Sequence, residues 1–318
     1  MTIHEIAFEV ELLSDVIITS NSSTEGGHES LDYLPGSLFL GALANARIMN
    51  GEKFDPAFFL SGQVRFGDAH IVVDKNWTYA IPLSFHYKKG ETWKSKKPFN
   101  LLEKSASSHE NLRQFRQGWM TPDGKIAFVH KPINTKTAID RESRRAKESQ
   151  LFQYESIPAE TKFRGKIVVE SPSLLQTIEK FLRENEVIFL GKSKSAEYGA
   201  AKIRQIPLNS EKPAPEPLLV NGYRRYHFYL LSDAALEQNG TLRLIPQARD
   251  FGLPPEAQLN WELTFLRTRI YSSWNAFFNS RMQEREVLCK GSVITFDVPE
   301  NIELDASNIA AKLETGIG

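Results

Sequence analysis

The order of hydrophobic periodicities along the chain limits the folds open to it. Residues 3–18 alternate apolar and polar side chains, as a strand does, and residues 38–49 repeat apolar side chains three and four positions apart, as a helix does. The same signals predict further strands near 64–66, 69–73 and 78–83, then a strand at 163–170, a helix at 172–185 and a strand at 187–190. Strand, helix, strand, given twice, is the βαββαβ order of a ferredoxin-like domain, so we expect an α+β fold.

A proline-rich segment at 211–220 divides the chain, with three prolines in the five residues from Pro213 to Pro217. Such a run forms a stiff linker between domains. We therefore expect an N-terminal domain at 1–210 and a C-terminal domain at 221–318. A chain of 318 residues leaves each of them enough material for a core of its own.

The C-terminal part repeats the pattern of the first domain in shortened form. Its periodicity predicts strands at 223–232, 259–271 and 292–298 and a helix at 305–314. Gly-Ile-Gly follows that helix, as a glycine turn follows the helix and strand of the first domain. We therefore expect a second ferredoxin-like domain that is incomplete at its C-terminus.

Net charge, cysteine and histidine content and the length of apolar runs limit the kinds of site and the cellular location expected for this protein. Lys and Arg total 39 and Asp and Glu total 39, so any attraction for a polyanion must come from local clusters of charge. The single Cys289 excludes an internal disulfide and a multi-Cys zinc site and suits the cytoplasm. His86, His109 and His130 lack partners at metal-ligand spacing, so we expect no metal and no cofactor. No apolar run approaches the ~20 residues of a membrane span, and we expect no secretion signal.

Charge is segregated in the stretch 88–147, which holds 15 Lys or Arg against six Asp or Glu. We expect a long basic insertion at about 88–150 in the first domain. Cations with aromatic residues between them suit a groove for a nucleic-acid backbone, in which each stacked base contributes ~1–3 kcal/mol. A solvated insertion without a ligand is the alternative. The densest cations are Arg141, Arg144, Arg145 and Lys147, and the interleaved aromatic residues are Trp93, Phe99, Phe115, Trp119 and Phe128.

A second basic feature is the turn at 191–199, which joins two predicted strands. Its glycines allow close approach to a ligand, and its lysines, serines and free backbone N–H groups suit a phosphate. A lysine-capped hairpin without a ligand is the alternative. The residues of this candidate site are Gly191, Lys192, Ser193, Lys194, Ser195, Tyr198 and Gly199.

Three separated motifs resemble those of the RAMP superfamily of CRISPR-associated proteins. They are Tyr-Leu-Pro-Gly-Ser at 33–37 with Gly-Ala-Leu at 41–43, Gln-Leu-Phe-Gln-Tyr-Glu at 150–155 with Phe-Arg-Gly at 163–165, and the glycine-rich turn. The match is closest to the RAMP subunit characteristic of subtype III-D effector complexes. Its C-terminal motifs correspond here to Arg267, Arg269, Trp274, Asn275, Gly291 and Ser292.

The resemblance implies a non-catalytic subunit for antiviral defence. Such a subunit caps the 5′ handle of the CRISPR RNA and joins the RAMP backbone subunits to the large subunit, and through them meets target RNA. By carry-over, the turn at 191–199 and the helix start at Gly36 and Ser37 are expected near RNA phosphates. Trp274 and Asn275 are expected to stack on and hydrogen-bond a handle base, with burial of Trp274 between domains as the alternative.

Two other classes of function stay open. A RAMP endoribonuclease would use His28 as its general base or acid, and a target-cutting backbone subunit would use Asp32. In the non-catalytic interpretation, His28 is an ordinary loop histidine and Asp32 stabilises a turn. A scaffold that binds only proteins would need neither residue nor the basic turn. Glu9 and Glu11 are expected to be solvated on a strand edge.

Overall fold

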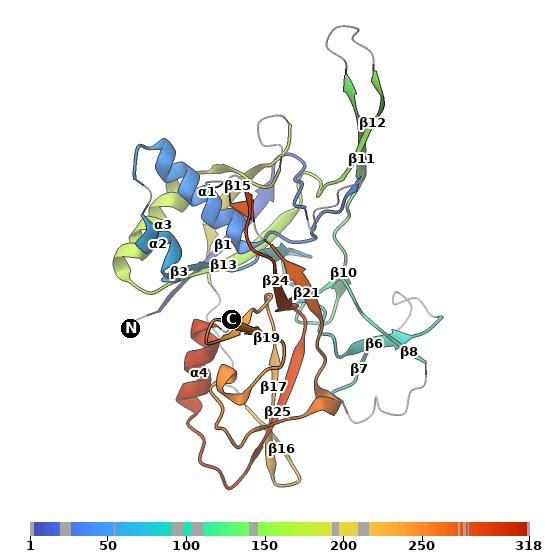
Figure 1. The fold of residues 1–318 in the computed structure, drawn as a ribbon, viewed down its shortest axis with the longest axis vertical. Coiled ribbons are helices and arrows are strands. Elements are labelled where there is room, and N and C mark those ends of the chain that lie inside the picture. The colour runs from blue at the N-terminus through green and yellow to red at the C-terminus, as the bar shows by residue number, and fades with distance from the viewer. Residues whose placement is uncertain are drawn as a thin grey trace. The chain divides into compact units, whose positions relative to one another are not determined.

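The computed structural model describes residues 3–19, 27–53, 55–90, 98–103, 111–139, 146–192, 197–208, 216–272, 274–275, 278 and 280–316. Contacts divide the chain into two compact units, Met1–Thr78 with Thr121–Asn209 and Tyr79–Met120 with Ser210–Gly318. Strands predominate and the helices are few (Figure 1). The mixed α and β class expected from the sequence is thereby confirmed.

A six-stranded sheet forms the centre of the first unit, in the order β14-β15-β1-β13-β3 with β4 also paired to β13. β1 lies between β13 and β15 and is antiparallel to both, with Glu9 opposite Arg164 on one side and Arg204 on the other. The strands are β1 His4–Leu12, β3 Val64–Phe66, β4 His70–Ile71, β13 Lys162–Val169, β14 Val187–Phe189 and β15 Ala200–Ile206.

Helices cover one face of this sheet. The even-numbered residues of β1 from Ile6 to Leu12 are buried in one cluster with Phe39 of α1 and Ile178 of α3. The odd-numbered residues therefore point to the other face, called here the outer face. Pro172 opens α3, and the Ser171 hydroxyl accepts a hydrogen bond from the Leu174 N–H. The helices are α1 Gly36–Met49, α2 Pro56–Leu60 and α3 Pro172–Glu184.

A long hairpin within the first unit was not expected from the sequence. β11 and β12 pair antiparallel, with a register shift between Thr137 and Ile139, and β2 adds to β12 in parallel. In Figure 1 this green hairpin stands away from the sheet of its own unit. The strands of this sheet are β2 Gly27–His28, β11 Ile133–Ile139 and β12 Ala146–Glu155, and the short strand β10 Ile126–Ala127, earlier in the chain, is not part of it.

The second unit has a sheet in the order β16-β17-β25-β20. Its core contains Phe228 of β17, Phe251, Phe296 of β25 and Ile309 of α4. The continuous strand expected at 259–271 is not formed, because the Asn260 side chain caps a 3-10 turn there by accepting from the Leu263 N–H. The elements are β16 Leu218–Val220, β17 Tyr223–Tyr229, β20 Gln258–Leu259, β25 Val293–Pro299, α4 Ala306–Thr315, η2 Ala248–Phe251 and η3 Trp261–Leu263.

Residues 79–120 are grouped with the C-terminal part of the chain, whereas all of 88–150 was expected in the first domain. The physical link is main-chain pairing, since the Leu83 N–H donates to the Gly291 carbonyl at 2.8 Å. The remaining strands of this unit are short: β5 Tyr79–Ala80, β6 Phe85–Lys88, β7 Phe99–Asn100, β8 Leu112–Gln114, β9 Trp119–Met120, β18 Leu236–Gln238, β19 Thr241–Arg243, β21 Thr268–Tyr271, β22 Trp274–Asn275, β23 Ser280–Arg281 and β24 Arg285–Leu288.

Within the described ranges, no helix has the length and apolar character needed to cross a membrane.

Candidate nucleic-acid interface

The glycine-rich turn between β14 and β15 is fitted closely to the chain's own backbone. Gly191 has φ +74°, and a Cβ there would lie 2.3 Å from the Ile17 carbonyl oxygen. Gly199 has φ +93°, and a Cβ there would lie 2.5 Å from the Leu190 carbonyl oxygen. Both positions therefore need glycine for the fold of the turn itself.

Hydrogen bonds tie the turn to the segment that follows β1. The Lys192 N–H donates to the Ile17 carbonyl and the Gly199 N–H to the Asp15 carbonyl, both at 2.9 Å. The expectation that backbone N–H groups of the turn are free for an anion is therefore wrong for these two groups. Tyr198 is buried, which suits packing better than contact with a ligand. Ser193, Lys194 and Ser195 lie outside the described residues.

Asp15 also connects the turn to the base of the β11–β12 hairpin. Its carboxylate accepts from the Ser156 hydroxyl at 2.8 Å and from the Ala159 N–H at 3.1 Å. The Asn134 side chain donates to the same Ser156 oxygen at 2.9 Å. Asp15 thus contacts the glycine turn through its backbone and the base of the hairpin through its side chain.

Glu155, the last residue of the Gln-Leu-Phe-Gln-Tyr-Glu motif, holds the loop that leads to α1. Its Oε2 accepts from Lys131 Nζ at 2.8 Å and from the Ser30 N–H at 3.1 Å, while Lys131 also donates to the Ser30 carbonyl. Burial alone would raise the pKa of Glu155, but the hydrogen bonds from Lys131 and Ser30 hold that pKa below its ordinary value. Two of the motif segments, the glycine turn and residues 150–155, therefore both bind the segment between β1 and α1, which leads into the third motif.

Gly36 and Ser37 start α1. Gly36 is buried, and its N–H donates to Asp68 Oδ1 at 3.1 Å. A Cβ at Gly36 would lie 1.9 Å from the Phe66 carbonyl oxygen, so this glycine lets the helix approach the end of β3. Ser37 is exposed on the first turn. The contacts of Gly36 are thus packing contacts within the unit, and a role in phosphate binding stays a prediction.

The outer face of the first sheet carries a buried carboxylate between two arginines. Glu9 is 3% exposed; Arg164 Nε donates to its Oε2 at 2.8 Å and Arg204 Nη2 to its Oε1 at 2.5 Å. Burial alone would raise the pKa of Glu9, but the hydrogen bonds from Arg204 and Arg164 outweigh it and lower that pKa. The expectation that Glu9 is solvated on a strand edge is wrong, because β1 is a central strand flanked by these arginines.

The basic stretch does not offer all the stacking surfaces expected of it. Phe115 and Trp119 are buried in the second unit, so they cannot stack on a base without unpacking. Phe128 is 42% exposed and Phe99 is half-buried. Trp93, Arg141, Arg144 and Arg145 lie outside the described residues, and the side chain of Lys147 is not described either.

The candidates of the C-terminal half are held by neighbours within their own unit. Arg269 Nε donates to Asp233 Oδ2 at 2.6 Å, and Arg267 Nη1 donates to the Arg116 carbonyl at 2.9 Å. The Asn275 oxygen accepts from the Phe278 N–H at 3.2 Å. The main chain of Trp274 pairs with Arg281, and its side chain lies outside the described part. Contact of these four residues with RNA stays a prediction.

The residues proposed for an alternative catalytic role lie in the loop before α1. His28 is placed by main-chain pairing with Tyr154, and its side chain is not described. Asp32 is half-buried. Within the described residues, no group of three His, Cys, Asp or Glu side chains could hold a metal ion.

The second sheet carries a polar cluster that was not predicted from the sequence. Arg225 makes a two-point ion pair with Asp297, at 2.6 and 2.9 Å, and Asn260 donates to the same carboxylate at 2.8 Å. Beside it, His227 Nδ1 lies 2.8 Å from the Thr295 hydroxyl oxygen, and that hydroxyl donates to the Leu263 carbonyl. The hydroxyl proton is thus already used, so His227 Nδ1 must be the donor to Thr295.

We expect the stability of the second unit to fall as pH drops below the ordinary histidine pKa of 6.5. Burial and then the charge of Arg225 lower the pKa of His227 in the folded state. Between the folded and the ordinary value the unfolded chain binds more protons, so stability rises with pH across that window. Replacement H227Q should flatten the melting temperature profile measured from about pH 5 to 7.5, and a variant profile parallel to the wild type would contradict this assignment.

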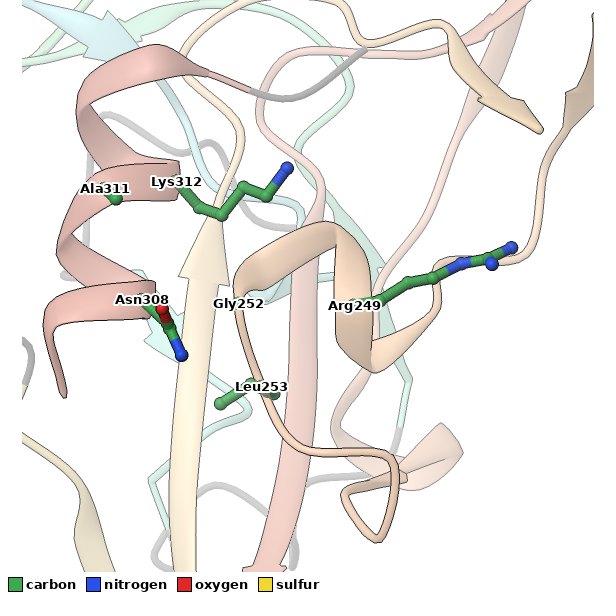
Figure 2. Close-up of a pocket in the computed structure, with 6 residues that line it drawn as sticks. All are labelled: Arg249, Gly252, Leu253, Asn308, Ala311 and Lys312. Carbon is green, nitrogen blue, oxygen red and sulfur yellow. The ribbon is translucent and has the colours of Figure 1, made fainter. Parts of the chain in front are cut away.

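A hollow of about 350 Å³ lies between η2 and α4. Figure 2 shows the residues that line it, which are Arg249, Gly252, Leu253, Asn308, Ala311 and Lys312. The Arg249 side chain is directed away from α4, and both Arg249 and Lys312 are exposed (Figure 2). The two cations therefore do not converge on one ligand. Sequence patterns could not find this hollow, since its two walls lie far apart along the chain.

No protein-family model matches the chain, and no curated protein matches it either. Two solved structures share its fold over almost the whole length. One is described as the Type III-B Cmr-beta bound to cognate target RNA and AMPPnP, state 1, with 11% identity, 98% of this chain and 94% of that chain covered, and a TM-score of 0.52. The other is the Type III-B Cmr-beta bound to cognate target RNA, with 11% identity, 97% and 94% covered, and a TM-score of 0.51. At this identity the likeness establishes the fold alone.

Proposed function

We propose that this chain is an RNA-binding structural subunit of a type III CRISPR effector ribonucleoprotein. The observation that carries the proposal is the meeting of the glycine turn, the loop after β1 and Glu155 at one end of the first sheet. The glycine turn and Glu155 belong to motifs that resemble the RAMP superfamily, and the loop after β1 leads into the motif at 33–37. The fold shared with a Cmr-beta structure that was bound to target RNA supports the same conclusion.

The finer assignment is subtype III-D, with the chain capping the 5′ handle of the CRISPR RNA in the cytoplasm. The motifs at Arg267, Trp274 and Gly291 support the subtype, since they follow the order expected of that subunit. In this role the partners are the CRISPR RNA, the RAMP backbone subunits and the large subunit. The chain bridges the last two and meets target RNA only through them.

We propose a ferredoxin-like arrangement for each of the two units. In the first, the order β15-β1-β13-β3 with α1 after β1 and α3 after β13 corresponds to the strand order 4-1-3-2 of that fold. In the second, β17, β20, β25 and α4 correspond to all but the first helix and the last strand. RNA-recognition modules use the same architecture.

We propose that the subunit does not cleave RNA. Gripping an RNA end needs cations and hydrogen-bond donors at a fixed turn, whereas cleavage needs a general acid and base near the 2′-OH. Incubation of the pure chain with labelled RNA tests this. Cleavage that H28A or D32A abolishes, with binding retained, would replace the capping role by an endoribonuclease.

Reversing the charge of Lys192 and Lys194 together, K192E with K194E, should weaken RNA binding at least tenfold, because phosphate contacts dominate affinity. Fluorescence anisotropy with a labelled RNA that carries the 5′ handle measures the effect. The matched control is K180E with R183E on α3, which lies on the helix-covered face of the sheet. An unchanged affinity in the turn variant would favour the protein-binding scaffold.

A further inference from the structure

We infer that the RNA path continues from the glycine turn onto the outer face of the first sheet, where a hollow above Glu9 binds one phosphate group. This inference rests on the proposed RNA-binding function and names a subsite of it. The hollow has a volume of about 450 Å³. Its charged lining consists of Lys75, Lys162, Arg164, Arg204, Glu9 and Glu160.

The charges of the hollow favour an anion. Four cations line the hollow, against two carboxylates. One of the cations, Lys162, also forms an ion pair with Glu11, in which Nζ and Oε1 are 3.6 Å apart. Glu9 alone neutralises neither Arg164 nor Arg204 fully, since one carboxylate faces two guanidinium groups. Arg204 is 61% exposed and gives one nitrogen to Glu9, while a guanidinium carries five N–H donors. Donors therefore remain to meet a phosphate.

Arg164 is held in place before any ligand arrives. Arg164 donates from Nε to Glu9 and from Nη1 to the Lys75 carbonyl, at 2.8 and 2.6 Å. That carbonyl belongs to a tight turn in which Asp74 and Lys75 have φ +49° and +66°. Because both partners fix the guanidinium, little side-chain entropy is left to lose on binding.

β15 links this hollow to the glycine turn. The strand starts directly after Gly199, and Ala201 and Ile203 are buried on the helix side. Lys202 and Arg204 therefore share the outer face, about 6.7 Å apart along the strand. Lys202, which also pairs with Glu186 at 3.5 Å, and Arg204 thus extend from the end of the glycine turn toward the hollow. Cations spaced along a strand in this way suit the regularly repeated charges of a polyanion.

The test compares R204A and K75N with the control K180A, which removes an exposed lysine from the opposite face. Asn suits the positive φ of residue 75, and residues 75 and 204 are exposed, so both variants should fold. Anisotropy with a short labelled single-stranded RNA is measured over a series of KCl concentrations. We expect roughly threefold to tenfold weaker binding for each variant and a salt slope reduced by about 0.7, and no change for K180A.

The outcomes separate this inference from the function on which it rests. If the wild-type chain binds no RNA, both the proposed RNA-binding function and the phosphate subsite are wrong. If K192E with K194E abolishes binding while R204A and K75N keep the wild-type affinity and salt slope, the hollow is not a phosphate subsite and the proposed function stands. If R204A weakens binding of polyglutamate and leaves RNA binding unchanged, the occupant is an acidic protein segment instead.

Discussion

Replacing Gly36 by alanine is expected to destabilise the first unit by about 3 kcal/mol, because the new methyl group has no room. The added Cβ would lie 1.9 Å from the Phe66 carbonyl oxygen and 2.7 Å from its carbon. Both are backbone atoms at the end of β3, so α1 itself would have to shift. That shift would disturb Phe39, whose ring packs edge-on against Phe8 at 4.8 Å and stacks with Phe66 at 6.4 Å.

The same helix supplies the control. Gly41 has nothing within 4 Å of an added Cβ, so G41A should instead stabilise the unit by roughly 0.5–1 kcal/mol, since alanine loses less backbone entropy than glycine in a helix. Urea unfolding of both variants measures the difference. Equal stabilities for G36A and G41A would mean that α1 does not lie against β3 as described.

Replacing Glu9 by alanine is expected to lower the free energy of unfolding by about 3 kcal/mol, since it leaves Arg164 without its buried partner. The figure is at the low end for a buried pair because Arg204 can turn to solvent. The matched control is E11A on the same face of β1, where the pair with Lys162 is 3.6 Å long and both side chains are at least 40% exposed. That change should stay within about 0.5 kcal/mol.

Glu9 should also make stability depend on pH. Its folded pKa lies below the ordinary value of 4.5, so its contribution is complete above that value and is lost as pH falls through the folded pKa. E9Q should remove this part of the acid sensitivity, measured as melting temperature below about pH 5. An E9Q profile that still parallels the wild type there would show that other carboxylates cause the acid loss.

Helices and strands whose ends are determined by residues within or next to them could be predicted from the sequence. The helix expected at 172–185 forms at Pro172–Glu184, since the Ser171 cap, the proline and the apolar stripe all lie within it. The first strand stops at Leu12, earlier than expected, because Val16 bridges to Ile157 and Thr19 to Ser30. Those partners are remote in sequence, and periodicity carries no information about them.

In the candidate site, too, features set by neighbouring residues could be predicted and features set by remote residues could not. The position of the glycine turn was predictable, because Gly191 and Gly199 flank a basic run between two strands. The use of its N–H groups was not, since their acceptors, Asp15 and Ile17, are almost the whole unit away along the chain. Glu9 alternates with apolar residues as any exposed sheet residue does, and only the arrival of Arg164 and Arg204 from two other strands buries it.

The division of the chain into two units affects how it can fold during synthesis. Residues 79–120 belong with residues 210–318, so the chain passes between the units after Thr78, Met120 and Asn209. At ribosomal rates of about 5–20 residues per second, residues 79–120 emerge on the order of ten seconds before the strands they join. Buried surfaces such as that of Trp119 are uncovered for that interval, and a single cut in the proline-rich segment cannot release the second unit whole, since residues 79–120 stay with the N-terminal fragment.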